Sequence, residues 1–140
     1  MKNINKSNHI LFGIVLLCIT AFTACSKNEP TPDNSELILG KWSVFIDAYF
    51  QENGKSREFV QRMTTSPGVF EFGKDGKMKI GEADKYYTVS GNQLILDKEY
   101  TITKLDKKNL VFELITEENF DYEGRIGTVY YVVTGTRITE

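Results

Sequence analysis

A series of short segments in which apolar and polar residues alternate constrains the fold of this chain more than any other feature. The alternation is clear in residues 69–114, for example at Phe70 and Phe72, which would share one face of a strand. Asp75-Gly76 and Gly91-Asn92 separate such segments, and residues of this kind suit the tight turns of hairpins. No stretch of the sequence repeats with the 3.6-residue period of a long helix. The sequence therefore predicts an all-β domain of antiparallel hairpins.

The terminal strands decide between an open and a closed sheet. We expect the first strand within Gly40–Phe50 and the last within Gly127–Thr139, which is apolar on both faces. A strand of this kind would promote aggregation at an open sheet edge. Pairing the last strand with the first removes both edges. The sequence thus favours an antiparallel up-and-down barrel of about eight strands, without a C-terminal helix, over a sandwich.

Residues 51–67 interrupt this regular pattern. Asn53-Gly54 is a turn signal. The residues from Ser56 to Met63 fit either a short helix with Phe59 on its apolar side or an irregular extra strand, and the sequence leaves both open. This region is the best candidate for a lid or entrance loop of the barrel.

The N-terminus has the layout of a secretory signal peptide. Lys2 and Lys6 form a basic start without acidic residues, and an apolar run over residues 10–24 follows, ending in small residues before Cys25. The run is short for a membrane-spanning helix and is soon followed by polar residues. We expect residues 1–24 to be a signal peptide that is removed.

The cleavage region resembles the lipobox of bacterial lipoproteins, with Ala24 before Cys25. This resemblance implies that Cys25 is lipidated, becomes the mature N-terminus and anchors the protein to a membrane of the bacterial cell envelope. Residues 25–36 are polar apart from two prolines, so they predict a flexible tether, and the folded domain is expected over residues 37–140. Because Cys18 would leave with the signal peptide, the mature domain would contain no disulfide.

The net charge and the residue types present narrow the classes of function expected for the mature domain. The formal net charge is −2, and loss of Lys2 and Lys6 with the leader takes it to −4, which argues against a nucleic-acid partner. The single histidine, His9, lies in the leader, so the mature domain cannot build a histidine-dependent nucleophile or a histidine metal site. We therefore expect no catalytic residues, metal or cofactor, and no enzymatic activity.

Two polar features of the sequence, a cluster and a single acid, are candidates for a site. One group precedes the last strand without calcium-loop spacing, and we expect it to form a solvated hairpin loop: Glu117, Glu118, Asn119, Asp121 and Glu123. The other is Asp47 in the first strand, which strand alternation places on the outer face, opposite to Trp42. Neither group predicts a reactive site.

Gly40-Lys41-Trp42 resembles the Gly-x-Trp signature of lipocalins, and Arg137 stands where that family places an arginine that packs across the tryptophan. Residues 37–139 are also similar to the short lipocalin-like, calycin-type domains of bacterial lipoproteins, notably in the segments Phe70–Lys77, Tyr87–Leu94 and Tyr100–Leu105. The resemblance implies a barrel that binds a ligand at its mouth. It also implies that Gly40, Trp42 and Arg137 close the opposite end through a cation–π contact.

Alternation along the strands gives the side chains expected to face the barrel interior, and thus a ligand if one binds: Val44, Ile46, Phe70, Phe72, Met78, Ile80, Leu94, Leu96, Ile102, Leu110, Phe112, Leu114, Val129, Tyr131 and Val133. An eight-stranded barrel is either filled by its own side chains or holds one small ligand. Two hypotheses follow. The protein is a membrane-anchored binding module for a small apolar or lipid-like ligand, or it is a filled-barrel lipoprotein that docks another protein of the cell envelope. The sequence does not address its oligomeric state.

Overall fold

The computed structural model describes residues 32–139, which belong to a compact unit running from Pro32 to Glu140. The predicted signal peptide, the lipidation site at Cys25 and most of the predicted tether lie outside the described residues. Within residues 32–139 the only helix is α2 (Asn34–Leu37), and no helix there has the length and apolar character needed to cross a membrane.

Ten antiparallel strands follow α2 in a single sheet. They are β1 (Gly40–Glu52), β2 (Glu58–Arg62), β3 (Gly68–Phe72), β4 (Lys77–Ile80), β5 (Ala83–Tyr86), β6 (Thr88–Ser90), β7 (Gln93–Ile95), β8 (Glu99–Leu105), β9 (Asn109–Tyr122) and β10 (Arg125–Arg137). The all-β prediction is confirmed, but about eight strands were expected. The region 51–67 contains the additional strand β2 rather than a helix.

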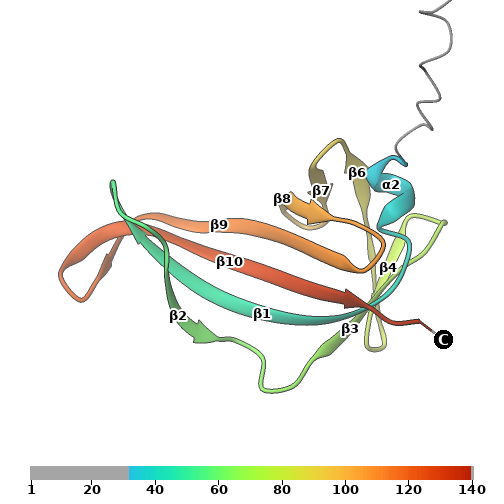
Figure 1. Cartoon of the computed structure of the whole chain (residues 1–140), viewed down its shortest axis with the longest axis horizontal. Helices are drawn as coiled ribbons and strands as arrows, with labels where there is room; N and C mark the ends of the chain where they lie inside the picture. Colours follow the sequence, from blue (N-terminus) through green and yellow to red (C-terminus); the bar gives the residue numbers. More distant parts are fainter. Residues whose placement is uncertain (1–31, 140) are drawn as a thin grey trace, which may run out of the picture. The chain divides into compact units, whose positions relative to one another are not determined.

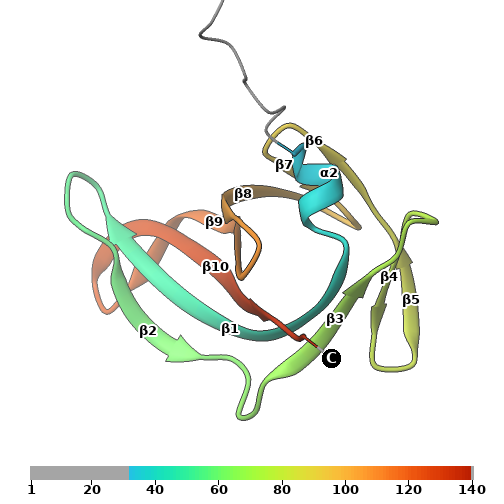
Figure 2. The same cartoon turned by 45° about the vertical axis from the view of Figure 1, so that its right-hand side comes forward.

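The first and last strands pair, as the sequence predicts. The register runs from Trp42 opposite Arg137 to Glu52 opposite Gly127. The strand order is β5-β4-β3-β1-β10-β9-β8-β7-β6, with β2 beside β1. The sheet curls into a nearly closed barrel (Figure 2). Among the described strands, β5 and β6 are the two ends of this order and do not pair with each other, and we call the gap in pairing between the two ends the seam.

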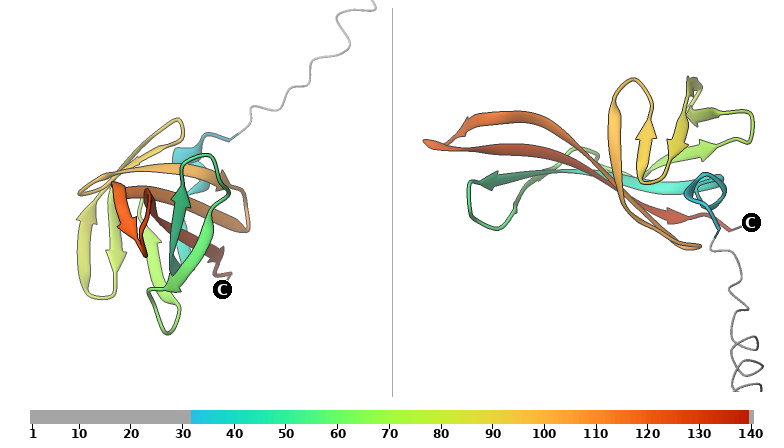
Figure 3. Two further views of the ribbon diagram at one scale, coloured as in Figure 1. Left: turned by 90° about the vertical axis from the view of Figure 1, so that its left-hand side faces the viewer. Right: turned by 90° about the horizontal axis from the view of Figure 1, so that it is seen from above.

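The long strands divide between two regions. The first part of β1 pairs with β3, and its second part, Asp47–Phe50, pairs with β2. Likewise β9 pairs with β8 only up to Glu113. Beyond these points, β2 and the distal parts of β1, β10 and β9 form a four-stranded extension, residues 47–62 and 114–132, that projects from the short strands (Figures 1 and 3). We call the remainder the barrel end.

The core lies in the barrel end and is centred on Trp42, whose side chain is completely buried. The Trp42 indole Nε1 donates a hydrogen bond of 2.7 Å to the carbonyl of Ile38, which is also fully buried. The turn of α2 positions this carbonyl, and Asn34 Nδ2 fastens α2 to the barrel through a 2.9 Å bond to the Gly91 carbonyl. Residues 34–36, predicted as tether, therefore belong to the folded unit.

The acidic residues before the last strand do not form the loop that the sequence predicts. β9 continues through Glu117, Glu118, Asn119 and Asp121, and only Glu123 of the group lies in the turn that joins β9 to β10. The inner-face packing of this segment explains the difference, because the Tyr122 ring lies 5.2 Å from that of Phe50 between ring centroids. This contact reaches from β9 to β1 across β10, and together with the pairing of β9 with β10 it holds the acidic segment in the sheet despite its weak strand preference.

Candidate ligand cavity

A cavity of about 180 Å³ lies between the strands of the barrel end and reaches the start of the extension at Leu114 and Tyr131. Its walls are mainly aliphatic and aromatic, and most come from the inner faces of β1, β3, β4, β9 and β10: Ile46, Phe70, Met78, Ile80, Leu96, Phe112, Leu114, Tyr131 and Val133, with Lys85, Asp97 and Tyr100 completing the lining. A small, largely apolar space with a few polar groups is the usual make-up of a small-molecule site. The cavity is therefore the candidate site.

The sequence predicted most of this lining. Of the other residues predicted to face the interior, Val44, Phe72, Leu94, Ile102 and Leu110 are buried in the core but do not line the cavity, and Val129 lines a separate groove. These residues fill the barrel around Trp42. The interior is thus neither wholly filled nor roomy.

Sequence reasoning missed three lining residues, Lys85, Asp97 and Tyr100. Tyr100 shares the alternation of Ile102, and its ring packs edge-on against Phe112 with centroids 5.4 Å apart, so the strand pattern could have identified it. Lys85 and Asp97 carried no such signal, because Lys85 lies in a short exposed strand and Asp97 in the bend between β7 and β8.

The two charged residues form an ion pair at the edge of the cavity. Lys85 Nζ lies 3.2 Å from Asp97 Oδ2, and the side chains are 44% and 57% exposed. The hydrogen bond from Lys85 lowers the pKa of the Asp97 carboxyl, and bonds from the backbone N–H groups of Asp97 and Lys98 add to the effect. Burial, with a smaller contribution from Asp97, raises the pKa of the Tyr100 phenol. At neutral pH the Asp97 carboxyl is therefore ionised and the Tyr100 phenol is protonated.

This ion pair spans the seam of the barrel. Lys85 belongs to β5 at one end of the strand order, whereas Asp97 lies beside β7 near the other end. Elsewhere, Tyr87, which links β5 to β6, donates from its backbone N–H to the Gly76 carbonyl at 2.9 Å and from its hydroxyl to the Gly73 carbonyl at 2.8 Å, and so fastens this link to the turn between β3 and β4. The ion pair of Lys85 with Asp97 is thus a side-chain contact across the seam rather than part of a strand ladder.

A second, larger groove of about 350 Å³ lies on the inner face of the four-stranded extension. Its lining is more polar: Ala48, Phe50, Val60, Gln61, Thr116, Glu117, Phe120, Tyr122, Val129 and Tyr131. Tyr131 lines both the groove and the cavity. The four β9 residues of this lining, Thr116, Glu117, Phe120 and Tyr122, were not identified from the sequence, because a loop was expected there.

The predicted contact between Arg137 and Trp42 is present. The guanidinium carbon of Arg137 lies 4.1 Å from the centroid of the Trp42 ring, and Arg137 also donates to the carbonyls of Leu39 and Lys107. Gly40 has a φ of 110°, and a Cβ there would lie 2.8 Å from Arg137 Nη1. Glycine at this position allows the arginine to approach, and a cation–π contact of this kind contributes about 0.5 to 2 kcal/mol. Trp42 lines neither the cavity nor the groove.

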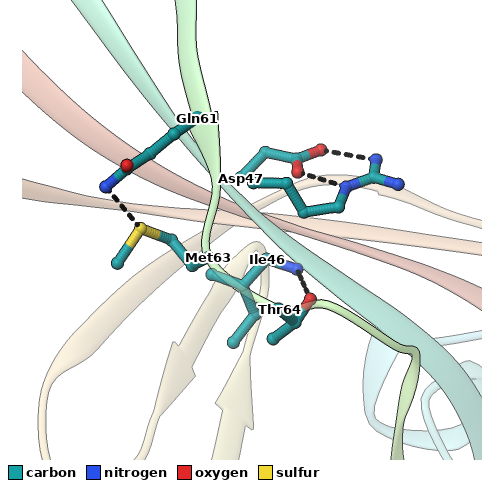
Figure 4. A network of polar contacts seen from close by, with 6 residues as sticks. Ile46, Asp47, Gln61, Met63 and Thr64 are labelled. Carbon is teal, nitrogen blue, oxygen red and sulfur yellow. Dashed lines mark hydrogen bonds and ion pairs between the residues drawn. The ribbon is translucent and has the colours of Figure 1, made fainter.

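Asp47 lies on the outer face, as predicted, but is only 7% exposed because Arg62 of β2 covers it. The Arg62 Nε and Nη2 atoms donate to the two carboxylate oxygens at 2.8 and 3.1 Å, and the guanidinium carbon lies 4.2 Å from the centroid of the Phe45 ring. Figure 4 shows this pair beside the bond from the Ile46 backbone N–H to the Thr64 hydroxyl, at 3.3 Å. The arrangement fastens β2 to β1 and is structural.

Within residues 32–139, no group of three or more histidine, cysteine, aspartate or glutamate residues could hold a metal ion. Comparisons with protein-family models, with curated proteins and with solved structures find no significant match to this chain.

Proposed function

We propose that this protein is a membrane-anchored, lipocalin-like lipoprotein whose barrel binds one small apolar or lipid-like ligand. The observation that carries the proposal is the apolar cavity, which is lined by side chains from several strands and leaves space in an otherwise packed core. A concave, mainly apolar space with a few polar groups at its mouth is the usual form of a small-molecule site, and this supports the proposal.

The cavity volume limits the ligand. Pockets for drug-sized molecules measure about 300–1,000 Å³, and the cavity here is about 180 Å³. The ligand is therefore a small molecule, or a larger one that inserts only its apolar end. Tyr131 stands where a longer ligand would pass from the cavity into the groove of the extension.

The proposed location follows from the sequence. A basic start, an apolar run and Ala24-Cys25 support export and lipidation at Cys25. The module would then stand in the bacterial cell envelope. Substitution of Cys25 by Ser should abolish lipid labelling, and unchanged membrane association of that variant would contradict the anchor.

Native mass spectrometry and uptake of an apolar fluorescent probe by the full-length protein test the binding function. Leu114→Trp should fill much of the cavity and reduce probe uptake strongly, because Leu114 lines it. Ile115→Trp is the matched control, since this neighbour on β9 lies on the outer face and is 50% exposed. Equal probe uptake by the two variants would contradict the proposal.

A second candidate function, docking of another envelope protein, is favoured by the outer face of the extension. Four large side chains form one row across its strands: Phe59, Tyr49, Tyr130 and Ile115. Phe59 is 57% exposed and Ile115 50% exposed, although strand alternation would normally place polar residues here. Cross-linking in intact cells should then give an adduct that Phe59→Ser removes, and an adduct pattern unchanged by this substitution would contradict docking on this face.

A further inference from the structure

The edge of the cavity carries two opposite charges that an apolar ligand does not require. Lys85 and Asp97 are the only charged side chains among the described residues that line the cavity, and they form a half-exposed ion pair there. Exposed pairs of this kind contribute little to folding stability. Stability therefore gives no strong reason for placing this pair at the mouth of an apolar space.

The two charges are able to separate. They lie near opposite ends of the strand order, and no strand ladder joins their segments across the seam. Asp97 lies in the bend between β7 and β8, whereas the Lys85 ammonium ends a flexible four-carbon side chain. The ammonium can move away from the carboxylate while both strands stay in place.

The pair discriminates among ligands by their charge. A ligand with a single charge would bind one member and leave the other beside a like charge, which is unfavourable. A neutral ligand would leave the pair intact and gain nothing from it. A ligand with both an ammonium and a carboxylate would satisfy Asp97 and Lys85 together.

The volume of the cavity limits the size of the apolar group that such a ligand can carry. At roughly 30 Å³ for each water in the liquid, the volume of about 180 Å³ corresponds to about six water-sized groups. A branched aliphatic or aromatic side chain is of this size. We propose, as a refinement that rests on the function proposed above, that the ligand is a small zwitterion of the apolar α-amino acid class. Its side chain occupies the cavity, its ammonium pairs with Asp97 and its carboxylate pairs with Lys85.

Four probes of matched shape test this assignment by NMR titration of the methyl groups of the full-length protein. They are L-leucine, L-leucinamide without the carboxylate, 4-methylpentanoate without the ammonium, and the neutral 3-methylbutan-1-ol. Shifts are followed at cavity residues such as Ile46 and Ile80, with Ile126 on the outer face of the extension as the reference. Leucine should bind about three- to tenfold more tightly than each singly charged analogue, since each lost pair is exposed and weak.

Two charge-removing variants assign the partners. In Lys85→Gln, leucine should lose its advantage over leucinamide, and in Asp97→Asn it should lose its advantage over 4-methylpentanoate. Lys55→Gln is the control, because Lys55 forms a similar exposed ion pair with Glu52 away from the cavity. This control should keep both advantages.

The outcomes separate the refinement from the proposed function. If the alcohol shifts the cavity methyls and leucine binds no more tightly than its analogues, the zwitterion assignment is wrong and apolar binding stands. Leucinamide as tight as leucine would also contradict the assignment and would point to the N-terminus of a peptide. If none of the four probes shifts the cavity methyls, both proposals fail.

Discussion

The barrel end and the four-stranded extension share β1, β9 and β10 but are stabilised in different ways. In the barrel end, strands surround a buried core in which Trp42, Leu94 and Leu110 are fully inaccessible. In the extension, surface ion pairs and rings lie along a single curved layer, for example the pair of Arg125 with Glu58 at 2.6 Å and the guanidinium of Arg57 over Tyr130 at 3.7 Å. The main core cluster therefore forms where the sheet closes, whereas the extension buries only a few side chains, such as Phe50 and Ala48.

The largest effect should come from Trp42. Trp42→Ala removes a fully buried ring together with its bond to Ile38 and its contact with Arg137. Large-to-small changes of this kind cost about 3–5 kcal/mol of unfolding free energy. Urea denaturation should show this loss, whereas a loss below 1 kcal/mol would contradict the central position of Trp42.

Substitution of two glycines with positive φ, one in the barrel end and one in the extension, compares the two regions more finely. Gly40 in the barrel end has little room, and Gly124 in the turn at the tip of the extension has open space around it. Gly40→Ala should therefore cost about 2 kcal/mol, from backbone strain and displacement of Arg137, and Gly124→Ala about 1 kcal/mol from strain alone. Equal losses in denaturation experiments would show that contact with Arg137 adds nothing.

A smaller effect is expected on the outer face of the extension. Phe59→Ala removes an exposed ring that packs edge-on against Tyr49, with centroids 5.8 Å apart. One cross-strand aromatic pair contributes roughly 0.2–1 kcal/mol, so the midpoint of urea denaturation should fall only slightly. A loss close to that of Trp42→Ala would mean that the extension contributes to the core.

The smallest expected effect is the pH dependence due to Asp97. Lys85 lowers the pKa of this carboxyl in the folded state, so its contribution is complete above its unfolded pKa of about 3.9 and is lost as the pH falls through the lower folded value. Comparison of the wild type with Asp97→Asn at pH 6 and pH 3 should show a difference below about 1 kcal/mol that shrinks at pH 3. A difference that grows at the lower pH would contradict this sign.

Sequence patterns predicted the barrel end far better than the extension. Alternation and the pairing of the terminal strands identified most of the cavity lining, since a closed, buried face requires apolar residues at every second position. The sequence did not predict that β9 continues through Glu117 and Glu118, because partly exposed strands tolerate charged residues that are also common in loops. The mouth pair was missed because Lys85 and Asp97 meet across the seam, and no local pattern reports that contact.

The most direct test of the cavity as a binding site is a methyl NMR titration of the full-length protein with a small neutral probe, 3-methylbutan-1-ol. The proposed site predicts saturable shifts at Ile46, Ile80 and Leu114, which line the cavity, and none at the exposed Ile126 and Ile138. Shifts that are absent from the cavity methyls, or that appear equally at the exposed ones, would contradict it.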